Sequence, residues 1–239
     1  MNILHCRAFY RILRAKPNLD RSARRIEEKW HAHLNTNLSV TFWNNAWALH
    51  ASMQFNNQFK WLQCQILRNC LFTNNRVSKF KPWISDRCDL CGLHIETPLT
   101  LFSQCPLVLV FWSEIKEYFE YFDFDLPIGR LQILFGVHTE KCDSVKNIAI
   151  LIGKRTIWIC KYKKIHPTLN HFKKILKDYL IILSFCHSYK NTSSAFVDQW
   201  GRLYWLLRGN YGPQLPLRDD QPDGQLDQGH SLHNFQWQG

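Results

Sequence analysis

The sequence predicts a mainly α-helical fold, made of a helical domain with a small Cys-rich loop and a disordered C-terminal tail. Apolar residues recur at helical spacing along most of the chain, and the alternating pattern of half-buried strands is nearly absent. The 239 residues are 46% apolar and 14% aromatic, which is ample for a packed core and excludes an intrinsically disordered chain. The low numbers of Gly (10) and Pro (9) residues argue against collagen-like and low-complexity architectures.

Composition and periodicity divide the chain into four segments. Residues 1–38 are predicted to form a basic N-terminal helical segment, and residues 39–125 a helical region that contains the Cys-rich loop at 85–106. Residues 126–205 are predicted to form C-terminal helices with a basic face. From residue 206 to residue 239, Gly, Pro and Asp residues break the helical periodicity, so we expect this tail to be disordered.

Local signals predict the helix boundaries and the core faces. Ser39 is predicted to cap one helix, and Pro106 fits the first turn of another. The helix before the Cys-rich loop has an apolar face of Phe59, Leu62, Ile66 and Cys70. The helix after Pro106 carries a stripe of Val108, Phe111, Trp112, Ile115, Phe119 and Phe122. After a turn at 166–168, the last long helix has a core stripe of Phe172, Ile175, Leu176, Tyr179, Leu183 and Cys186.

The charge of the chain is large and unevenly spread. The net charge is +11, and most of the excess lies in residues 1–30 (+5) and 151–192 (+8). Such clustering favours a polyanionic partner, either a nucleic acid or an anionic membrane surface, over a uniformly solvated basic surface. The chain has no apolar run of about 18 residues and no secretory signal pattern, so we expect no membrane span. We therefore expect an intracellular protein, nuclear or cytoplasmic, with reduced thiols.

Three cysteines between residues 88 and 105 form the most informative cluster. Cys88 and Cys91 have the Cys-x-x-Cys spacing that lets two thiolates reach one tetrahedral ion, and Gly92 suits the turn after them. Cys105 is a candidate third ligand, and His94 is the only histidine between these cysteines. Two alternatives stay open, namely a redox pair and buried thiols in a helical core.

An ordered set of short motifs runs through residues 29–205. Around the Cys-rich loop these are Phe59-Lys60-Trp61-Leu62, Asn74-Asn75-Arg76-Val77, Cys88-Asp89-Leu90-Cys91, Glu96-Thr97, Cys105-Pro106 and Phe111-Trp112. Downstream they are Ile133-Leu134-Phe135-Gly136-Val137, Pro167-Thr168-Leu169 and Phe196-Val197-Asp198-Gln199-Trp200. In this order and spacing the set resembles the zinc-binding region at the C-terminal end of LINE-type (non-LTR) retrotransposon reverse transcriptases.

The resemblance implies a zinc knuckle with ligands in the pattern Cys-x2-Cys, His, four residues, Cys. Cys88, Cys91 and Cys105 fall on its cysteine positions, whereas its histidine position falls on Thr100, whose neutral hydroxyl is a poor zinc ligand. His94 is the candidate substitute, so the sequence leaves zinc binding open.

The resemblance also implies that the chain helps to hold RNA or DNA. Candidate phosphate contacts lie on the N-terminal segment and on the two helices of the basic C-terminal face: Arg21, Arg24, Arg25, Lys154, Arg155, Lys161, Lys163, Lys164, Lys173, Lys174 and Lys177. Binding through such residues is salt-dependent and weakly sequence-specific. Exposed aromatic side chains such as Trp61 and Trp83 are candidates for stacking on unpaired bases.

Independent catalysis is not expected. The only Asp-Asp pair, Asp219-Asp220, lies in the predicted tail and outside the hairpin context of a polymerase. No P-loop, Gly-rich dinucleotide turn or nucleophile motif is present, which also argues against a small-molecule substrate. The alternative to nucleic-acid binding is a degenerate retrotransposon remnant, or a protein-interaction module, with no retained biochemical activity.

Overall fold

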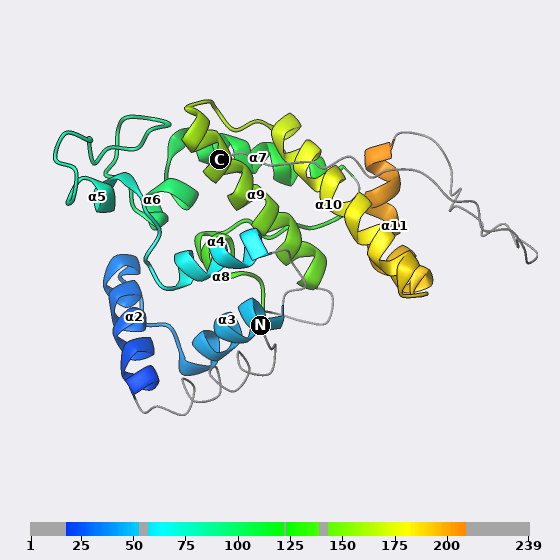
Figure 1. Ribbon diagram of the computed structural model, residues 1–239, viewed down its shortest axis with the longest axis horizontal. Helices are drawn as coiled ribbons and strands as arrows, with labels where there is room; N and C mark the ends of the chain where they lie inside the picture. Colours follow the sequence, from blue (N-terminus) through cyan, green and yellow to red (C-terminus); the bar gives the residue numbers. More distant parts are fainter. Residues whose placement is uncertain (1–17, 53–56, 122, 139–142, 209–239) are drawn as a thin grey trace, which may run out of the picture.

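A computed structural model describes residues 18–52, 57–121, 123–138 and 143–208 of the chain (Figure 1). Its helices are α2 (Asn18–Leu34), α3 (Val40–Ser52), α4 (Asn57–Leu67), α5 (Asn74–Val77), α6 (Pro98–Ser103), α7 (Pro106–Glu120), α8 (Arg130–Phe135), α9 (Asp143–Lys163), α10 (Leu169–Tyr189) and α11 (Ser193–Arg208). Within the described residues no strand is present, and one isolated antiparallel bridge joins Arg87 to Ile95. The prediction of a mainly helical fold is confirmed. Residues 209–239 of the predicted tail lie outside the described residues, and α11 covers residues 206–208.

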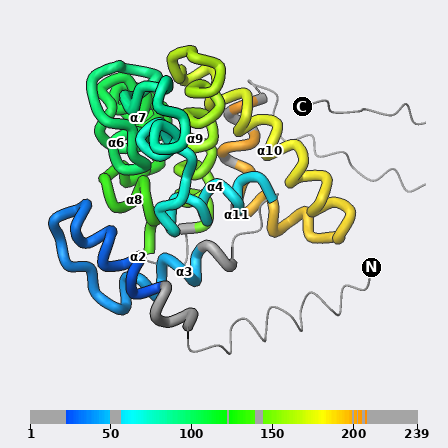
Figure 2. Tube along the Cα trace, turned by 60° about the vertical axis from the view of Figure 1, so that its left-hand side comes forward, coloured from blue at the N-terminus to red at the C-terminus, as the bar shows by residue number. Residues whose placement is uncertain are grey.

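The helices are arranged around α9, the long helix at the centre of the molecule. Helices α4, α8 and α10 all contact α9. In Figures 1 and 2, α2 and α3 lie at one end of the molecule, and α10 and α11 lie side by side at another. The loops around α5 extend from the upper left in Figure 1 and lead into α6 and α7. The Cys-rich loop is therefore set at the edge of a continuous helical core.

Aromatic side chains connect the N-terminal helices to this core. Trp30 of α2 and Trp43 of α3 are buried, and both rings meet the ring of Phe135 edge-on, with centroids 5.1 Å and 5.3 Å away. The Trp30 indole N–H donates to the main-chain oxygen of Leu67 at 2.9 Å. A buried indole keeps such a partner because an unpaired N–H in the core is costly. The predicted N-terminal and central segments thus share one hydrophobic core.

The predicted helix starts are confirmed. The Ser39 hydroxyl accepts the Phe42 N–H at 3.1 Å, as an N-cap does. Pro106 is the first residue of α7, where its missing N–H costs nothing. The apolar stripe of this helix is buried as predicted: Val108, Phe111, Trp112, Ile115 and Phe119. Phe122, the last member of the predicted stripe, lies outside the described residues.

The predicted core stripe of α10 is confirmed from Phe172 to Leu183, with Ile175, Tyr179 and Leu183 half-buried against the core. Phe172 and Leu176 are buried, whereas Cys186 is exposed. The prediction was wrong for Cys186, which lies in the second half of α10, beyond Leu183, the last residue of the stripe that packs against the core. Ile182, Phe185 and Tyr189 in that half are also exposed, at helical spacing.

No helix in the described parts of the chain has the length and apolar character that crossing a membrane requires.

Candidate metal centre

Three cysteine sulfurs converge where the Cys-rich loop meets the start of α7. The Sγ atoms of Cys88, Cys91 and Cys105 all lie within 4.8 Å of one another, and those of Cys88 and Cys105 are 3.9 Å apart. Cys88 and Cys105 are buried, and Cys91 is half-buried. Zinc–thiolate bonds of about 2.3 Å in a tetrahedron set the sulfurs about 3.8 Å apart. The three thiols are therefore close enough to one another to hold one metal ion.

Main-chain hydrogen bonds form the turn that carries Cys88 and Cys91. The Cys88 N–H donates to the carbonyl oxygen of His94 at 2.8 Å, and the Gly92 N–H donates to the carbonyl oxygen of Cys88 at 2.8 Å. Gly92 has a φ of +68°, a conformation that a residue with a Cβ adopts at a cost. The sequence expectation of a turn at Gly92 is confirmed.

The path of α6 returns Cys105 to this turn. Cys105 is the N-cap of α7, and its N–H donates to the carbonyl oxygen of Thr100 at 2.8 Å. The fixed φ of Pro106 then directs the chain into the first turn of α7. The third sulfur is thus placed by a helix–helix corner between residues 103 and 106.

The side chain of Thr100, which stands at the histidine position of the pattern that the sequence resembles, forms hydrogen bonds at a helix start. Thr97 and Thr100 form a capping box at the start of α6, in which the Thr100 hydroxyl accepts the Thr97 N–H at 2.7 Å. The same hydroxyl donates to the carbonyl oxygen of Ile95 at 2.7 Å. The hydroxyl of Thr100 is therefore occupied by the backbone of the helix start.

His94 is not brought together with the three sulfurs in the described structure. Its side chain is exposed, and the metal-ligating group consists of Cys88, Cys91 and Cys105 without it. Its main-chain oxygen, in contrast, helps to form the turn. His94 as a fourth ligand stays a prediction, and the arrangement as it stands is a three-thiol group able to hold a metal ion.

The environment favours a thiolate at Cys88. The Cys105 thiol stabilises the ionised form of Cys88, and with the main-chain N–H groups near its sulfur it lowers the pKa of Cys88 to about 5, against the opposing effect of burial. The pKa of Cys105 is raised because its thiol donates a hydrogen bond to the Cys88 sulfur and because Cys105 is buried. Since the thiolate is the metal-binding form, one ligand is ready at neutral pH and the next loses its proton on metal binding.

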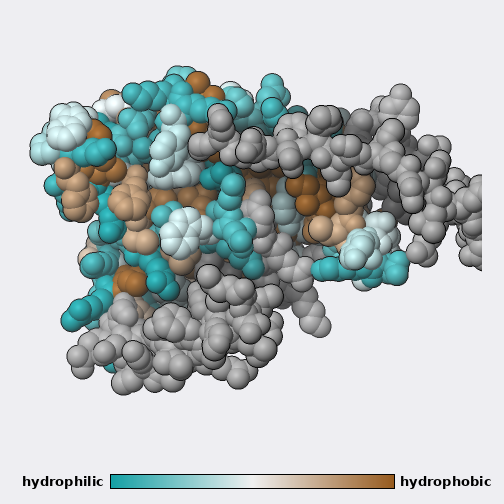
Figure 3. Space-filling model, viewed as in Figure 1, coloured by the Kyte–Doolittle hydropathy of each residue, from teal (hydrophilic) through white to brown (hydrophobic). Residues whose placement is uncertain are grey.

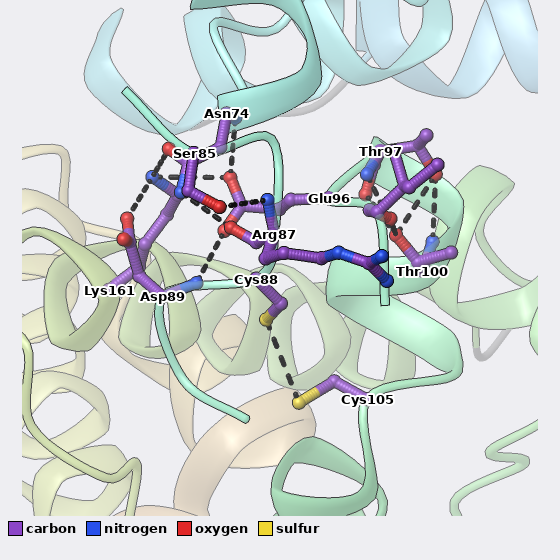
Figure 4. Close-up of polar contacts among 11 residues, drawn as sticks. Asn74, Ser85, Arg87, Cys88, Asp89, Glu96, Thr97, Thr100, Cys105 and Lys161 are labelled. Atoms are coloured by element: carbon purple, nitrogen blue, oxygen red, sulfur yellow. Dashed lines mark hydrogen bonds and ion pairs between the residues drawn. The ribbon is translucent and has the colours of Figure 1, made fainter. Parts of the chain in front are cut away.

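A buried ionic cluster lies beside the cysteines and fixes the loop to α9. The Lys161 Nζ lies 2.9 Å from Asp89 Oδ2 and 3.2 Å from Glu96 Oε1, and it donates to Asn74 Oδ1 at 3.1 Å (Figure 4). Glu96 is fully buried and also accepts the N–H groups of Asn74 and Asp89, at 2.8 Å and 3.2 Å. One lysine of α9 therefore joins α5 to both halves of the Cys-rich loop.

The charges within this cluster compensate one another. Burial disfavours the Lys161 ammonium, but the two carboxylates outweigh it and raise the pKa of Lys161. Burial likewise opposes ionisation of Asp89, yet the hydrogen bond from Lys161 lowers the pKa of Asp89. For Glu96 burial is the larger effect, so its pKa is raised despite the hydrogen bonds that it accepts. The cluster is held by Lys161, because without it Glu96 would be a buried charge with no counterion.

Two residues predicted to contact nucleic acid lie inside the protein. Lys154 is 2% exposed and donates to the Gln63 side-chain oxygen, and Lys161 belongs to the ionic cluster. The prediction of a surface role was wrong for both. They lie on the face of α9 that also carries the buried Ile150 and Ile157, at spacings of four, three and four.

Of the other basic residues predicted to contact nucleic acid, some are exposed and others contact neighbouring side chains. The exposed ones are Arg24, Arg25, Lys163, Lys164, Lys174 and Lys177. Arg155 is half-buried and donates to Gln58 at 3.0 Å, and the Lys173 ammonium lies 4.2 Å from the centre of the Tyr118 ring. Nothing is described of the Arg21 side chain, although the residue lies in α2. The surface that remains lies mainly on α2, the end of α9 and α10.

Sequence reasoning missed the ionic cluster and an exposed aromatic loop. Glu96 and Asn74 belong to motifs of the resemblance, but their pairing with Lys161 spans 65 and 87 positions and has no local signal. The run Lys79-Phe80-Lys81-Pro82-Trp83 does alternate basic and aromatic residues, a pattern that is typical of nucleic-acid contacts. Only Trp83 of this run was among the expected contacts.

We expect one zinc ion per chain, lost when Cys88, Cys91 or Cys105 is replaced by Ser. Thr100→Ala is expected to keep the zinc, because its hydroxyl serves the helix cap, while losing about 1 kcal/mol of stability. Cys186→Ser, at an exposed cysteine of α10, is the matched control. Zinc content and the thiolate charge-transfer band of the cobalt-substituted protein measure the outcome. A folded wild type without zinc, or full zinc in Cys105→Ser, would contradict the assignment.

No protein-family model matches this chain, and no curated protein matches it either.

Proposed function

We propose that this chain is a nucleic-acid-binding domain whose Cys-rich loop is held by a structural zinc ion, and that it is similar in role to the C-terminal region of LINE-type reverse transcriptases. The observation that carries the proposal is the convergence of Cys88, Cys91 and Cys105 at the cysteine positions of the family pattern. The proposal includes no catalytic step.

Zinc in this group would act as a cross-link. Cys88 and Cys91 belong to the turn after the Asn74 to Arg87 segment, whereas Cys105 starts α7, whose buried face belongs to the core. An ion shared by the three sulfurs would tie the exposed loop to the core helix, which is the usual role of thiolate-rich zinc sites. Zinc binding would then contribute directly to the stability of the loop.

Exposed basic residues at the end of α9 and on α10 support nucleic-acid binding. Lys163 and Lys164 lie two and three residues after Lys161, at the end of α9. The nearby carboxylates of Asp89 and Glu96 are already paired with Lys161. Within the described residues, no ion pair involves Lys163, Lys164, Lys174 or Lys177. Exposed ammonium groups that are not held in an ion pair are suited to contact phosphates and to release the counterions of the nucleic acid.

The proposal is tested by the salt dependence of binding to single-stranded and duplex RNA and DNA. We expect affinity to fall steeply with salt. Replacing Lys163, Lys164, Lys174 and Lys177 together by Gln is expected to lower the slope of log K against log salt by about 0.7–0.9 for each phosphate that the variant no longer neutralises. Lys116→Gln is the matched control, because Lys116 is exposed but paired with Glu120 at 3.3 Å. A folded, zinc-loaded protein without salt-dependent binding would overturn the proposal and favour a remnant without activity.

A further inference from the structure

An exposed loop between α5 and Cys88 presents aromatic and basic side chains together. Phe80 and Trp83 are 72% and 78% exposed, and Lys79 and Lys81 beside them are exposed as well. In Figure 3, brown and near-white side chains reach the surface among teal ones at the upper left, where Figure 1 labels α5. Single exposed rings are common on folded domains, but two exposed rings three residues apart and flanked by lysines form a local patch of the kind that marks interaction sites.

The loop is held in shape by its own hydrogen bonds. The N–H groups of Phe80 and Lys81 donate to the carbonyl oxygen of Val77 at 3.0 Å and 2.9 Å, and the Ile84 N–H donates to that of Lys81 at 2.9 Å. The last bond closes a four-residue turn with Pro82 at its second position, which proline favours. The two rings are therefore presented by an ordered backbone, which reduces the entropy lost on binding.

The hydrogen bonds of α5 connect this loop to the metal centre. Asn74 donates its side-chain N–H to the carbonyl oxygen of Arg87 at 2.8 Å, and its main-chain N–H to Glu96. The loop thus starts and ends on residues held by the ionic cluster, next to Cys88. Its position depends on the contacts that Lys161 of α9 makes with Asn74, Asp89 and Glu96.

The charge of the loop selects the kind of partner. Residues 76–87 contain four basic side chains and one acidic one, a net charge of +3. Asp86, the acidic one, lies 3.9 Å from Arg87. The Arg76 guanidinium lies 5.4 Å from the centre of the exposed Phe72 ring, so Phe72 has a cation over its face. Flat rings next to unpaired cations match alternating bases and phosphates.

We propose that residues 76–83 form a binding site for single-stranded nucleic acid, in which Phe80 and Trp83 stack on unpaired bases and Lys79 and Lys81 contact the flanking phosphates. This inference rests on the proposed function and adds the strandedness of the ligand and the residues that select it. Bases stacked in a duplex do not offer their faces, so the site discriminates against duplex.

Binding of the full chain, loaded with zinc, to a labelled oligouridylate tests this site. Phe80→Ala and Trp83→Ala are each expected to weaken binding about tenfold. Lys79→Gln and Lys81→Gln are each expected to lower the salt slope by about 0.7. Tyr189→Ala is the matched control, because Tyr189 is 91% exposed at the end of α10, away from the loop in Figures 1 and 2. This control is expected to leave the affinity unchanged.

An abasic strand with the same number of phosphates separates stacking from charge. The wild type is expected to bind it at least tenfold more weakly than oligouridylate, whereas Phe80→Ala/Trp83→Ala binds both strands alike. Equal binding of both strands by the wild type overturns the stacking site but leaves the proposed function standing. No binding of any nucleic acid overturns both. Binding only to vesicles of anionic phospholipid, lost in Trp83→Ala, overturns the inference in favour of a membrane contact.

Discussion

Lys161→Met is expected to lower the free energy of unfolding by about 3–5 kcal/mol, the cost of removing one partner of a buried ion pair. The variant keeps the aliphatic part of the side chain but leaves Glu96, which is fully buried, without its cation. Glu96 would then be forced to bind a proton or to draw water into the core. Urea denaturation at a fixed concentration of free zinc measures the loss, since zinc bound to the folded protein would add stability by mass action.

Lys163→Met, two residues further along α9, is the matched control. Lys163 is exposed and has no ion pair in the described structure, so its replacement is expected to change stability by less than about 0.5 kcal/mol. Adding Glu96→Gln to Lys161→Met is expected to recover part of the loss, because the buried charge is removed with its partner. Equal effects of the two lysine variants would show that the ionic cluster does not hold the loop.

Lys154→Met is expected to change the pH dependence of stability. The substitution is expected to raise the free energy of unfolding at pH 6 and to lower it at pH 10. Burial lowers the pKa of Lys154 to about 7 from 10.5, and its described partner is the neutral Gln63 side chain. Between about pH 7 and pH 10.5 the unfolded chain binds a proton that the folded protein lacks, so this lysine makes stability rise with pH by about 1.4 kcal/mol per unit. Below pH 7 the full cost of the buried charge is present and constant.

This effect is measured as the difference in unfolding free energy between Lys154→Met and wild type at each pH. The contributions of the other titrating groups are the same in both proteins and cancel in the difference. We expect the variant to be more stable at pH 6 and less stable at pH 10, with a total change of roughly 4 kcal/mol. At pH 10 neutral Lys154 keeps its hydrogen bond, whereas Met leaves the Gln63 oxygen unpaired at a cost of about 1–3 kcal/mol. A difference that stays constant with pH would show that Lys154 keeps its ordinary pKa.

Secondary structure and the cysteine group were predictable because their signals are local. The stripe from Val108 to Phe119 repeats at helical spacing, and Ser39 and Pro106 mark helix starts by their own side-chain chemistry. Two cysteines in a Cys-x-x-Cys turn are close in any fold, and Cys105, the next cysteine along the chain, was the candidate for the third ligand. These features follow from residues a few positions apart, so the tertiary structure had little freedom to change them.

The surface was harder to predict, since burial of a charged side chain depends on partners far along the chain. Lys154 and Lys161 share a face with Ile150 and Ile157, and this periodicity indicates burial. The number of lysines in residues 151–192 does not reveal that two of them are buried, because composition does not distinguish the inner face of a helix from the outer one. Phe80 would count as a core candidate by hydrophobicity, yet the fold leaves it exposed, as it does Trp61 and Trp83, which were expected to be exposed.

The sequence by itself determined the helical class, the order of the helices and the cysteine group, because periodicity, capping and ligand spacing act over short distances. The tertiary structure decided which basic residues face solvent, that Thr100 caps a helix, and that Glu96 meets a lysine 65 residues later. A buried carboxylate can ionise only where a cation reaches it. The ion pair between Glu96 and Lys161 forms only when α9 packs beside the Cys-rich loop, so no local sequence pattern predicts it.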